Sequence, residues 1–410
     1  MTPRLRTSLR TLAASALVFS AGVSAFAQAP AGPPENTRLR VGPLFLNPTL
    51  SLTNAGVDDN VFNDPKSASP KSDVTVTATP KTDFWLRFGP TWLSGSVRED
   101  LVYYKENADE RSANITYELA WLIPFNRISF RPSAIYVDTR DRPGFEIDAR
   151  AARTDITYAG EVDVKWLSKS AVVLKASRFQ EQFDQSATFD DINLHDALNR
   201  VTTQETVSLE YHVTPLTTVS ADYSLSQDRF AYDTARNSDS TTVGGSVKFD
   251  PAALVKGTAM AGYQDYRPRD PSTPGYKGLT ATAALSYVLL GSTRFNVNVA
   301  RSVRYSYDIN QPYYIQTGGA LIVSQQIFGP VDVQALGGLY NLAYQDRAEA
   351  TVVEPDRVDH VKSIGGGIGY HFGRDTRLGF TVEQDRRDSV LTTHQYTGLR
   401  YGFSLTYGGN

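Results

Sequence analysis

Apolar and polar residues alternate along most of the chain after about residue 43. In residues 73–88, apolar side chains such as Val74 and Phe84 occupy even positions, while most threonines and the charged Lys81, Asp83 and Arg87 occupy odd positions. The same alternation recurs in residues 114–123, 219–226, 279–289 and 399–407. A repeat of two residues predicts β-strands with one apolar and one polar face.

The alternating segments are long for strands. Many contain about 10 to 15 residues, whereas strands of soluble sheets usually contain about five or six. A tilted strand needs about 9 to 11 residues to cross a bilayer. The lengths therefore favour an all-β fold, a transmembrane antiparallel up-and-down β-barrel.

Short and long connections alternate between these segments. Short turns occur at Gly89-Pro90, Pro215-Leu216-Thr217 and Phe328-Gly329-Pro330, and longer polar segments lie between them. This rhythm is typical of outer-membrane barrels, which have short periplasmic turns and long outer loops. We expect about 18 strands, or 16 if one hairpin is divided wrongly, with both ends in the periplasm. The expected spans are 43–53, 72–88, 91–105, 112–123, 128–137, 155–167, 171–180, 201–213, 218–228, 240–249, 254–264, 279–289, 294–307, 313–327, 331–344, 358–372, 377–385 and 396–408.

The first 27 residues have the pattern of a signal peptide. Arg4, Arg6 and Arg10 precede an apolar run, and Ala25-Phe26-Ala27 is a small-residue cleavage site. A short membrane anchor is the alternative. Residues 28–42 are rich in proline and predict an extended periplasmic segment, and residues 43–410 form the predicted barrel.

Composition narrows the chemistry. The chain has no cysteine, which excludes disulfides, thiol chemistry and cysteine-ligated metals. The net charge of −3 gives no indication of nucleic-acid binding, and we expect neither a cofactor nor a metal site. The expected surroundings of the barrel are outer-membrane lipids in the cell outer membrane of a Gram-negative envelope.

The polar face of the strands is expected to line a wide lumen. Its charges are of both signs, with no ladder of one sign, so we predict weak ion selectivity; the simpler interpretation is a solvated wall with internal salt bridges. Loops 138–154 and 181–200 are expected to cover or constrict the mouth. Neutral polar residues with Tyr104, Tyr314 and Tyr340 suit a hydrated sugar chain. The predicted lumen-lining charges are Arg87, Arg98, Asp100, Glu118, Arg131, Asp163, Lys165, Glu210, Asp222, Lys248, Arg304, Arg377 and Arg400.

Tryptophans lie close to the predicted short turns. Trp85, Trp92, Trp121 and Trp166 are expected to form an aromatic girdle at the membrane interface. Arg301 conflicts with the pattern, because it shares the parity of apolar neighbours. A lipid-facing arginine near mid-membrane costs about 2–4 kcal/mol, so we expect a bulge, a register shift or a position near the outer interface.

No catalytic constellation is evident. Only Asp190, Asp191 and His195 resemble the rim clusters of outer-membrane hydrolases, and their spacing in a loop is weak support. We therefore expect no catalytic residue and no enzymatic activity.

Two short motifs resemble those of a known family. The strand Leu44–Leu52, the turn Asp59-Asn60-Val61-Phe62 and the strand start Ser72-Asp73-Val74 resemble the opening of the putative β-barrel porin 2 family. Residues 401–407 resemble the C-terminal signal read by the outer-membrane insertion machinery, although the chain ends in Gly408-Gly409-Asn410 instead of an aromatic residue. The resemblance implies a barrel that belongs with exopolysaccharide export and its periplasmic polysaccharide-export proteins.

Three functions follow as hypotheses. The leading one is a porin-like outer-membrane channel, with polysaccharide export as its specific form. The second is a plugged structural or surface-interaction barrel whose outer loops bind a partner. The third, an outer-membrane hydrolase, depends on His195.

Overall fold

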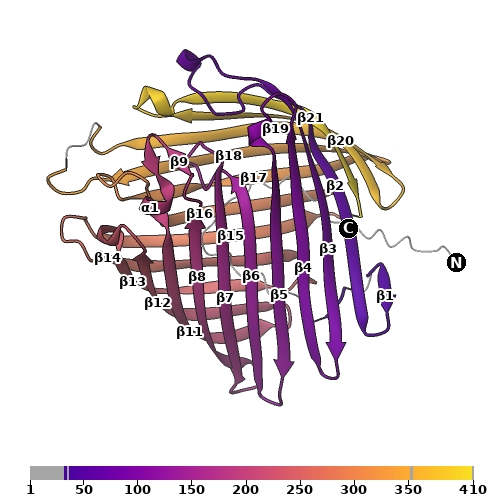
Figure 1. Cartoon of the computed structure of the whole chain (residues 1–410). Helices are drawn as coiled ribbons and strands as arrows, with labels where there is room; N and C mark the ends of the chain where they lie inside the picture. Colours follow the sequence, from indigo (N-terminus) through magenta and orange to yellow (C-terminus); the bar gives the residue numbers. More distant parts are fainter. Residues whose placement is uncertain (1–31, 35–36, 351–353, 409–410) are drawn as a thin grey trace.

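The structure is a computed structural model that describes residues 32–34, 37–350 and 354–408. Long antiparallel strands wrap around a common axis and form most of the molecule (Figure 1). The predicted signal peptide, residues 1–27, lies outside the described residues.

Eighteen of the strands close into a barrel. Each pairs with the next along the chain, and β2 pairs with β21 to complete the wall. This confirms the predicted antiparallel barrel of 18 strands. The strands are β2 (Leu44–Asp58), β3 (Asp73–Phe88), β4 (Thr91–Tyr104), β5 (Ser112–Pro124), β6 (Ile128–Asp141), β7 (Ala151–Lys165), β8 (Ser170–Phe183), β11 (Arg200–Thr214), β12 (Thr217–Phe230), β13 (Ser238–Phe249), β14 (Val255–Pro268), β15 (Tyr276–Leu289), β16 (Thr293–Tyr305), β17 (Tyr313–Phe328), β18 (Val331–Gln345), β19 (Val358–Phe372), β20 (Thr376–Asp388) and β21 (Tyr396–Tyr407).

A short strand precedes the barrel. The strand β1 (Leu39–Val41) folds back on the start of β2 and pairs Leu39 with Leu46. Gly42 turns the chain with a positive φ of 58°, which glycine adopts without steric cost. The sequence pattern did not indicate this hairpin.

The two faces of the wall differ as the alternation requires. Large apolar side chains such as Leu119, Leu209 and Leu279 are exposed on the outside, where lipid would cover them. The opposite face carries serine, threonine and charged residues, for example Ser96 and Glu118 on neighbouring strands β4 and β5. An apolar outer face and a polar inner face are what a barrel in a bilayer needs.

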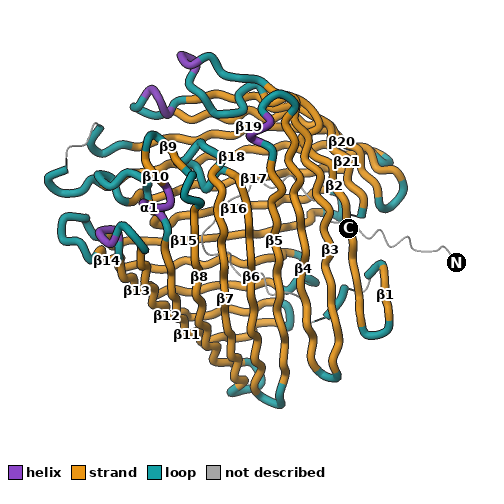
Figure 2. The backbone as a smooth tube through the Cα atoms, viewed as in Figure 1, coloured by secondary structure: helices purple, strands orange, loops and turns teal. Residues whose placement is uncertain are grey.

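The outer loops are longer and more structured than the turns at the other end (Figure 2). The connection from β8 to β11 contains a small hairpin, β9 (Thr188–Phe189) with β10 (Ile192–Asn193), and the one-turn helix α1 (Leu194–Leu198). Short 3-10 turns occur at Lys66–Ala68, Ala108–Glu110, Thr234–Arg236 and Thr392–His394. None of the helices in the described residues is long and apolar enough to cross a membrane.

Candidate functional site: a loop across the barrel interior

The loop of residues 142–150, between β6 and β7, reaches the opposite wall. The Phe145 ring lies 4.7 Å from the ring of Tyr340 on β18. Counted through the sequence of paired strands, β18 is the ninth strand from β7 in either direction, so the two are diametrically opposed. The loop therefore spans the barrel at its outer end. This agrees with the expectation that loop 138–154 folds into the mouth.

Hydrogen bonds at the base of the loop fix its direction. Arg142 donates through Nε to the carbonyl oxygen of Asp148 at 2.6 Å, which clips the two arms together. Arg142 and Arg150 both donate to the carbonyl of Val61 in the β2–β3 loop, at 2.7 and 3.1 Å. Arg150 also pairs with Glu110 at 3.3 Å. The base is thereby tied to two further outer loops.

The loop also carries an apolar anchor. Ile147 is buried in a cluster with residues of α1, including Leu194 and Leu198. Phe183 and Phe230, from the outer ends of β8 and β12, also belong to this cluster. The outer mouth thus contains a small hydrophobic core formed by loops, which makes residues 142–150 part of a packed unit.

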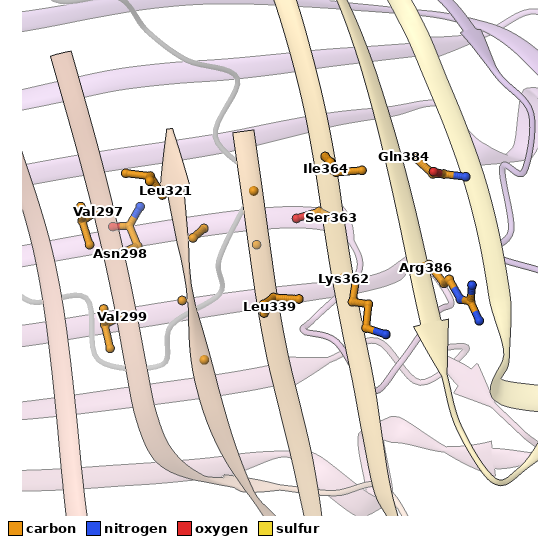
Figure 3. Close-up of a pocket in the computed structure, with 15 residues that line it drawn as sticks. Val297, Asn298, Val299, Leu321, Leu339, Lys362, Ser363, Ile364, Gln384 and Arg386 are labelled. Carbon is orange, nitrogen blue, oxygen red and sulfur yellow. The ribbon is translucent and has the colours of Figure 1, made fainter. Parts of the chain in front are cut away.

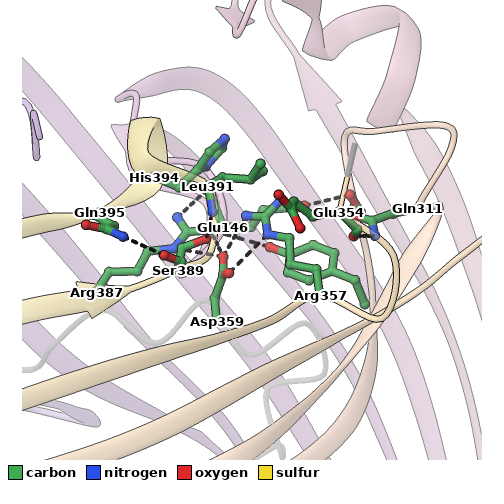
Figure 4. A network of polar contacts seen from close by, with 12 residues as sticks. Glu146, Gln311, Glu354, Arg357, Asp359, Arg387, Ser389, Leu391, His394 and Gln395 are labelled. Carbon is green, nitrogen blue, oxygen red and sulfur yellow. Dashed lines mark hydrogen bonds and ion pairs between the residues drawn. The ribbon is translucent and has the colours of Figure 1, made fainter. Parts of the chain in front are cut away.

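Arg387 on β20 holds the far end of the loop (Figure 4). Its guanidinium donates to the carbonyl oxygen of Glu146 at 2.9 Å and lies 3.0 Å from the Asp148 carboxylate. The same guanidinium lies 2.6 Å from Asp359 on β19, which also pairs with Arg357 at 2.6 Å. Arg387, Arg357 and Asp359 are buried. Such a network is stable only when every charge has a partner, as here.

The position of the loop buries the carboxyl group of Glu146. Its carboxylate accepts hydrogen bonds from Oγ of Ser306 at 2.6 Å and from the amide of Tyr307 at 3.3 Å. Burial raises the pKa of Glu146 to about 7, against the opposing effect of these bonds and of Arg357 and Arg387. The loop therefore holds a carboxyl group that titrates near neutral pH.

Aromatic side chains line the wall that the loop faces. Tyr314, Tyr340 and Tyr344 occupy even positions on β17 and β18, the inward parity of those strands, and are buried beneath the loop. Tyr314 and Tyr344 have ring centroids 5.2 Å apart. We call the region where loop 142–150 crosses the lumen the constriction. It combines a patch of aromatic rings with a paired network of charges.

The strand register places all the predicted lumen-lining charges on the inner face. Several are paired with a neighbour on the same face: Arg98 with Asp100 at 3.0 Å, Arg377 with Asp332 at 2.6 Å, and Arg400 with Asp385. Whether these residues choose among solutes stays a prediction. The full set is Arg87, Arg98, Asp100, Glu118, Arg131, Asp163, Lys165, Glu210, Asp222, Lys248, Arg304, Arg377 and Arg400.

Further from the outer mouth, one carboxylate forms ion pairs with two cations. Glu161 on β7 lies 3.7 Å from Arg131 on β6 and 3.5 Å from Lys175 on β8. These three strands are neighbours, so the cluster forms a short band across the inner wall. Wall charges of both signs in mutual contact leave little net field of one sign.

The aromatic girdle prediction is wrong for Trp85 and Trp92. Trp85 shares the odd, inward parity of Asp83 and is only 7% exposed, and Trp92 lies opposite the inward Arg87. The Arg87 guanidinium stands 5.5 Å from the Trp92 ring. Closeness to a short turn indicates height in the membrane, whereas parity decides the face, so only the outward Trp121 and the turn residue Trp166 are exposed as a girdle requires, at 42% and 66%.

The cluster predicted from Asp190, Asp191 and His195 is not assembled as one site. His195 contacts its neighbour Asp196 at 2.9 Å. Asp190 instead accepts from the Tyr307 hydroxyl at 2.7 Å and pairs with His394 at 3.1 Å. These contacts tie three outer loops together. Among the described residues, no three histidine or acidic side chains are grouped to hold a metal ion.

Sequence reasoning missed the residues that hold the loop. The sequence pattern predicted only that loop 138–154 covers or constricts the mouth, and it did not single out Glu146, Asp148, Asp359 or Arg387. No sequence rule identifies the residues that two acidic side chains in a polar loop, here Glu146 and Asp148, will contact. Arg387 lies at an inward position of β20, and only the path of the loop shows that it differs from the other inward arginines.

The chain is similar to a known protein family and to solved barrel structures. A family model described as "Putative beta-barrel porin 2" matches residues 33–407. Among solved structures, OpdQ of Pseudomonas aeruginosa is 10% identical with a TM-score of 0.44, covering 89% of this chain and 96% of that one. OccAB4 of Acinetobacter baumannii is 8% identical with a TM-score of 0.46, covering 88% and 97%. No curated protein sequence matches the chain.

Proposed function

The chain belongs to the Putative beta-barrel porin 2 family, and from that premise we propose that this outer-membrane barrel is a conduit for an extended, hydrated glycan in exopolysaccharide export. One observation carries the proposal: loop 142–150 crosses the outer end of the lumen and places Phe145 against an inward patch of tyrosines. Aromatic rings with a polar edge suit sugar rings, which have apolar faces and hydroxyl rims.

The charges of the wall support a neutral or weakly charged cargo. Arg98, Arg377 and Arg400 each have an acidic partner on the inner face. A strongly anionic polymer would instead be attracted by an excess of unpaired cations. A paired wall allows a polar chain to slide without being held at one point.

Planar bilayers test the proposal. Purified protein is inserted, and maltoheptaose, a neutral linear glucan, is added to one side. We expect single-channel currents that the glucan interrupts. The interruptions are expected to be shorter in Phe145→Ala, because the partly exposed Phe145 ring is lost as a contact, and in Tyr340→Ala, because the buried Tyr340 ring no longer holds Phe145 in place. Tyr263→Ala is the matched control, since Tyr263 is 53% exposed and lies on the outward face of β14. Currents unaffected by the glucan in the wild type would contradict the proposal.

The expected partners follow from the same role. We propose that periplasmic polysaccharide-export proteins meet the barrel at its short-turn end and that the chain performs no catalysis. In cells, removal of this barrel is expected to retain polysaccharide in the periplasm. Normal surface polysaccharide in its absence would separate the barrel from export, even if it conducts.

A second function is favoured by the hydrophobic core of the mouth. Ile147, Leu194 and Leu198 pack like the interior of a soluble domain, which suits a closed barrel whose outer loops bind a partner. Bilayer recordings decide between the two. Absence of any channel across a range of voltages would favour the plugged structural barrel.

A further inference from the structure

The outward face of β16–β20 is hollowed. A depression of about 820 Å³ lies on this wall, between exposed apolar side chains (Figure 3). Gly337 lies at its floor, opposite Leu321 on β17 and Ile364 on β19. Gly319 is likewise flanked by Val299 and Leu339.

The glycines make the depression because each stands where a large side chain would otherwise fill the wall. A Cβ built on Gly337 meets no atom within 4 Å, so the space above it is open. Leu339 and Ile364 beside it are 63% and 66% exposed. The result is a shallow apolar trough with ridges, a shape that acyl chains fill better than they fill a flat wall.

A polar row borders the trough on the side of the outer loops. Arg301, Thr317, Asn341, His360 and Asp388 lie opposite one another in register, one from each strand from β16 to β20. Arg301 donates to Oγ1 of Thr317 at 2.7 Å, and His360 contacts Asn341 at 2.7 Å. This row lies near the outer-loop ends of the strands. It explains Arg301, whose cost on a lipid-facing wall falls toward the interface.

Two cations stand between the polar row and the trough. Lys362 and Arg386 are direct cross-strand partners on β19 and β20 and lie side by side in Figure 3. Like charges placed opposite each other repel. Asp388 contacts both, at 3.1 and 2.6 Å, but one carboxylate neutralises only one of them. Their side chains remain 53% and 60% exposed, and with Arg301 the patch carries more positive than negative charge.

We propose that this face binds a phosphorylated, multiply acylated glycolipid of the outer leaflet. Acyl chains lie in the trough over Gly337, a phosphate lies against Lys362 and Arg386, and sugar hydroxyls contact the polar row. Charge complementarity selects this occupant, because a second copy of the chain would bring the same excess of cations to the interface. Basic residues at the membrane surface bind anionic headgroups in this way.

Native mass spectrometry tests the site with a defined probe. Purified barrel in dodecyl maltoside is mixed with hexa-acylated lipid A carrying both phosphates, and bound lipid is counted. We expect the double variant Lys362→Gln/Arg386→Gln to lower the affinity at least about tenfold, since charge-assisted contacts to phosphate are lost. Gly337→Trp is expected to do the same by filling the trough. Heat-modifiable migration on gels verifies that each variant is folded.

Matched control variants distinguish binding at this site from non-specific lipid binding. Lys277→Gln removes another outward lysine, 68% exposed and paired with Asp265, on a wall without the trough. Leu209→Trp adds an outward tryptophan on β11. Both are expected to bind lipid A as the wild type does. The proposal is overturned if the double variant binds normally, if fully dephosphorylated lipid A binds equally well, or if Gly337→Trp only converts dimers to monomers.

Discussion

At the residue scale, Arg387 is the side chain on which the constriction most depends. It is fully buried and contacts Glu146, Asp148 and Asp359 together. Removing one partner of a buried ionic network leaves the others uncompensated, at a cost of about 3–5 kcal/mol. The barrel wall does not depend on this contact, because each strand keeps its full ladder of backbone hydrogen bonds.

We therefore expect Arg387→Gln to release loop 142–150 while the barrel stays closed. Hydrogen exchange read by mass spectrometry is expected to show faster exchange in residues 142–150 and unchanged exchange in the strands. Arg386→Gln is the control, since Arg386 is next in sequence but points outward and is 60% exposed. Equal protection of the loop in wild type and Arg387→Gln would show that the apolar anchor alone holds it.

Glu146 makes the docking of the loop sensitive to pH. Its pKa in the docked loop is raised from 4.5 to about 7 by burial, so between these values the docked loop keeps a proton that the undocked loop releases. Docking is therefore strongest below about pH 4.5 and loses up to about 3 kcal/mol as the pH rises to about 7. We expect faster exchange of residues 142–150 at pH 8 than at pH 5.

The neutral isostere isolates this group. Glu146→Gln keeps the shape and the hydrogen bond from Ser306. We expect it to retain a protected loop at both pH values, after correction for the intrinsic exchange rate. If Glu146→Gln shows the same pH dependence as the wild type, the effect belongs to other groups, of which Asp148, whose pKa burial also raises, is the nearest on the loop.

At the element scale, alternation was enough to predict the strands. The expected spans 112–123 and 358–372 agree with β5 and β19 almost residue for residue, because a barrel strand shows lipid on one side and water on the other along its whole length. In segments that lack this contrast, the sequence pattern did not predict the structure. Contacts with distant segments fix β1, the hairpin β9–β10 and α1. The helix α1 has only five residues, and the side chain of Asn193 caps its N-terminus.

The tryptophans show how parity corrects a prediction based on position. Trp121 is outward and 42% exposed, whereas Trp85 is inward and 7% exposed, although both lie near a short turn. Variants that keep only one tryptophan test this. Brominated lipid is expected to quench the fluorescence of the Trp121-only protein strongly and that of the Trp85-only protein little. Equal quenching would mean that the register of β3 is shifted by one residue.

At the scale of the whole molecule, the loops and the wall divide the work. The wall supplies a polar tube with charges of both signs, several of them paired, and the outer loops supply a packed constriction across it. Sequence composition indicated the first, because a mixed set of charges without a ladder of one sign was visible in the alternation. It did not indicate the second, since no local pattern shows that Phe145 meets Tyr340 on the opposite side of the barrel.

Ion selectivity reports on the charges of the whole inner wall. Because the inner charges are of both signs and several are paired, a tenfold potassium chloride gradient is expected to give a reversal potential near zero in bilayers. Glu161→Gln releases both Arg131 and Lys175 from their shared carboxylate, so the reversal potential is expected to shift toward anion preference. Glu205→Gln makes the same change of charge on the outward face of β11, where it is expected to leave selectivity unchanged. A wild-type channel with strong preference for either ion would mean that unpaired groups near the loop, such as the buried Arg304 Nε that lacks a hydrogen-bond partner, control passage more than the paired wall does.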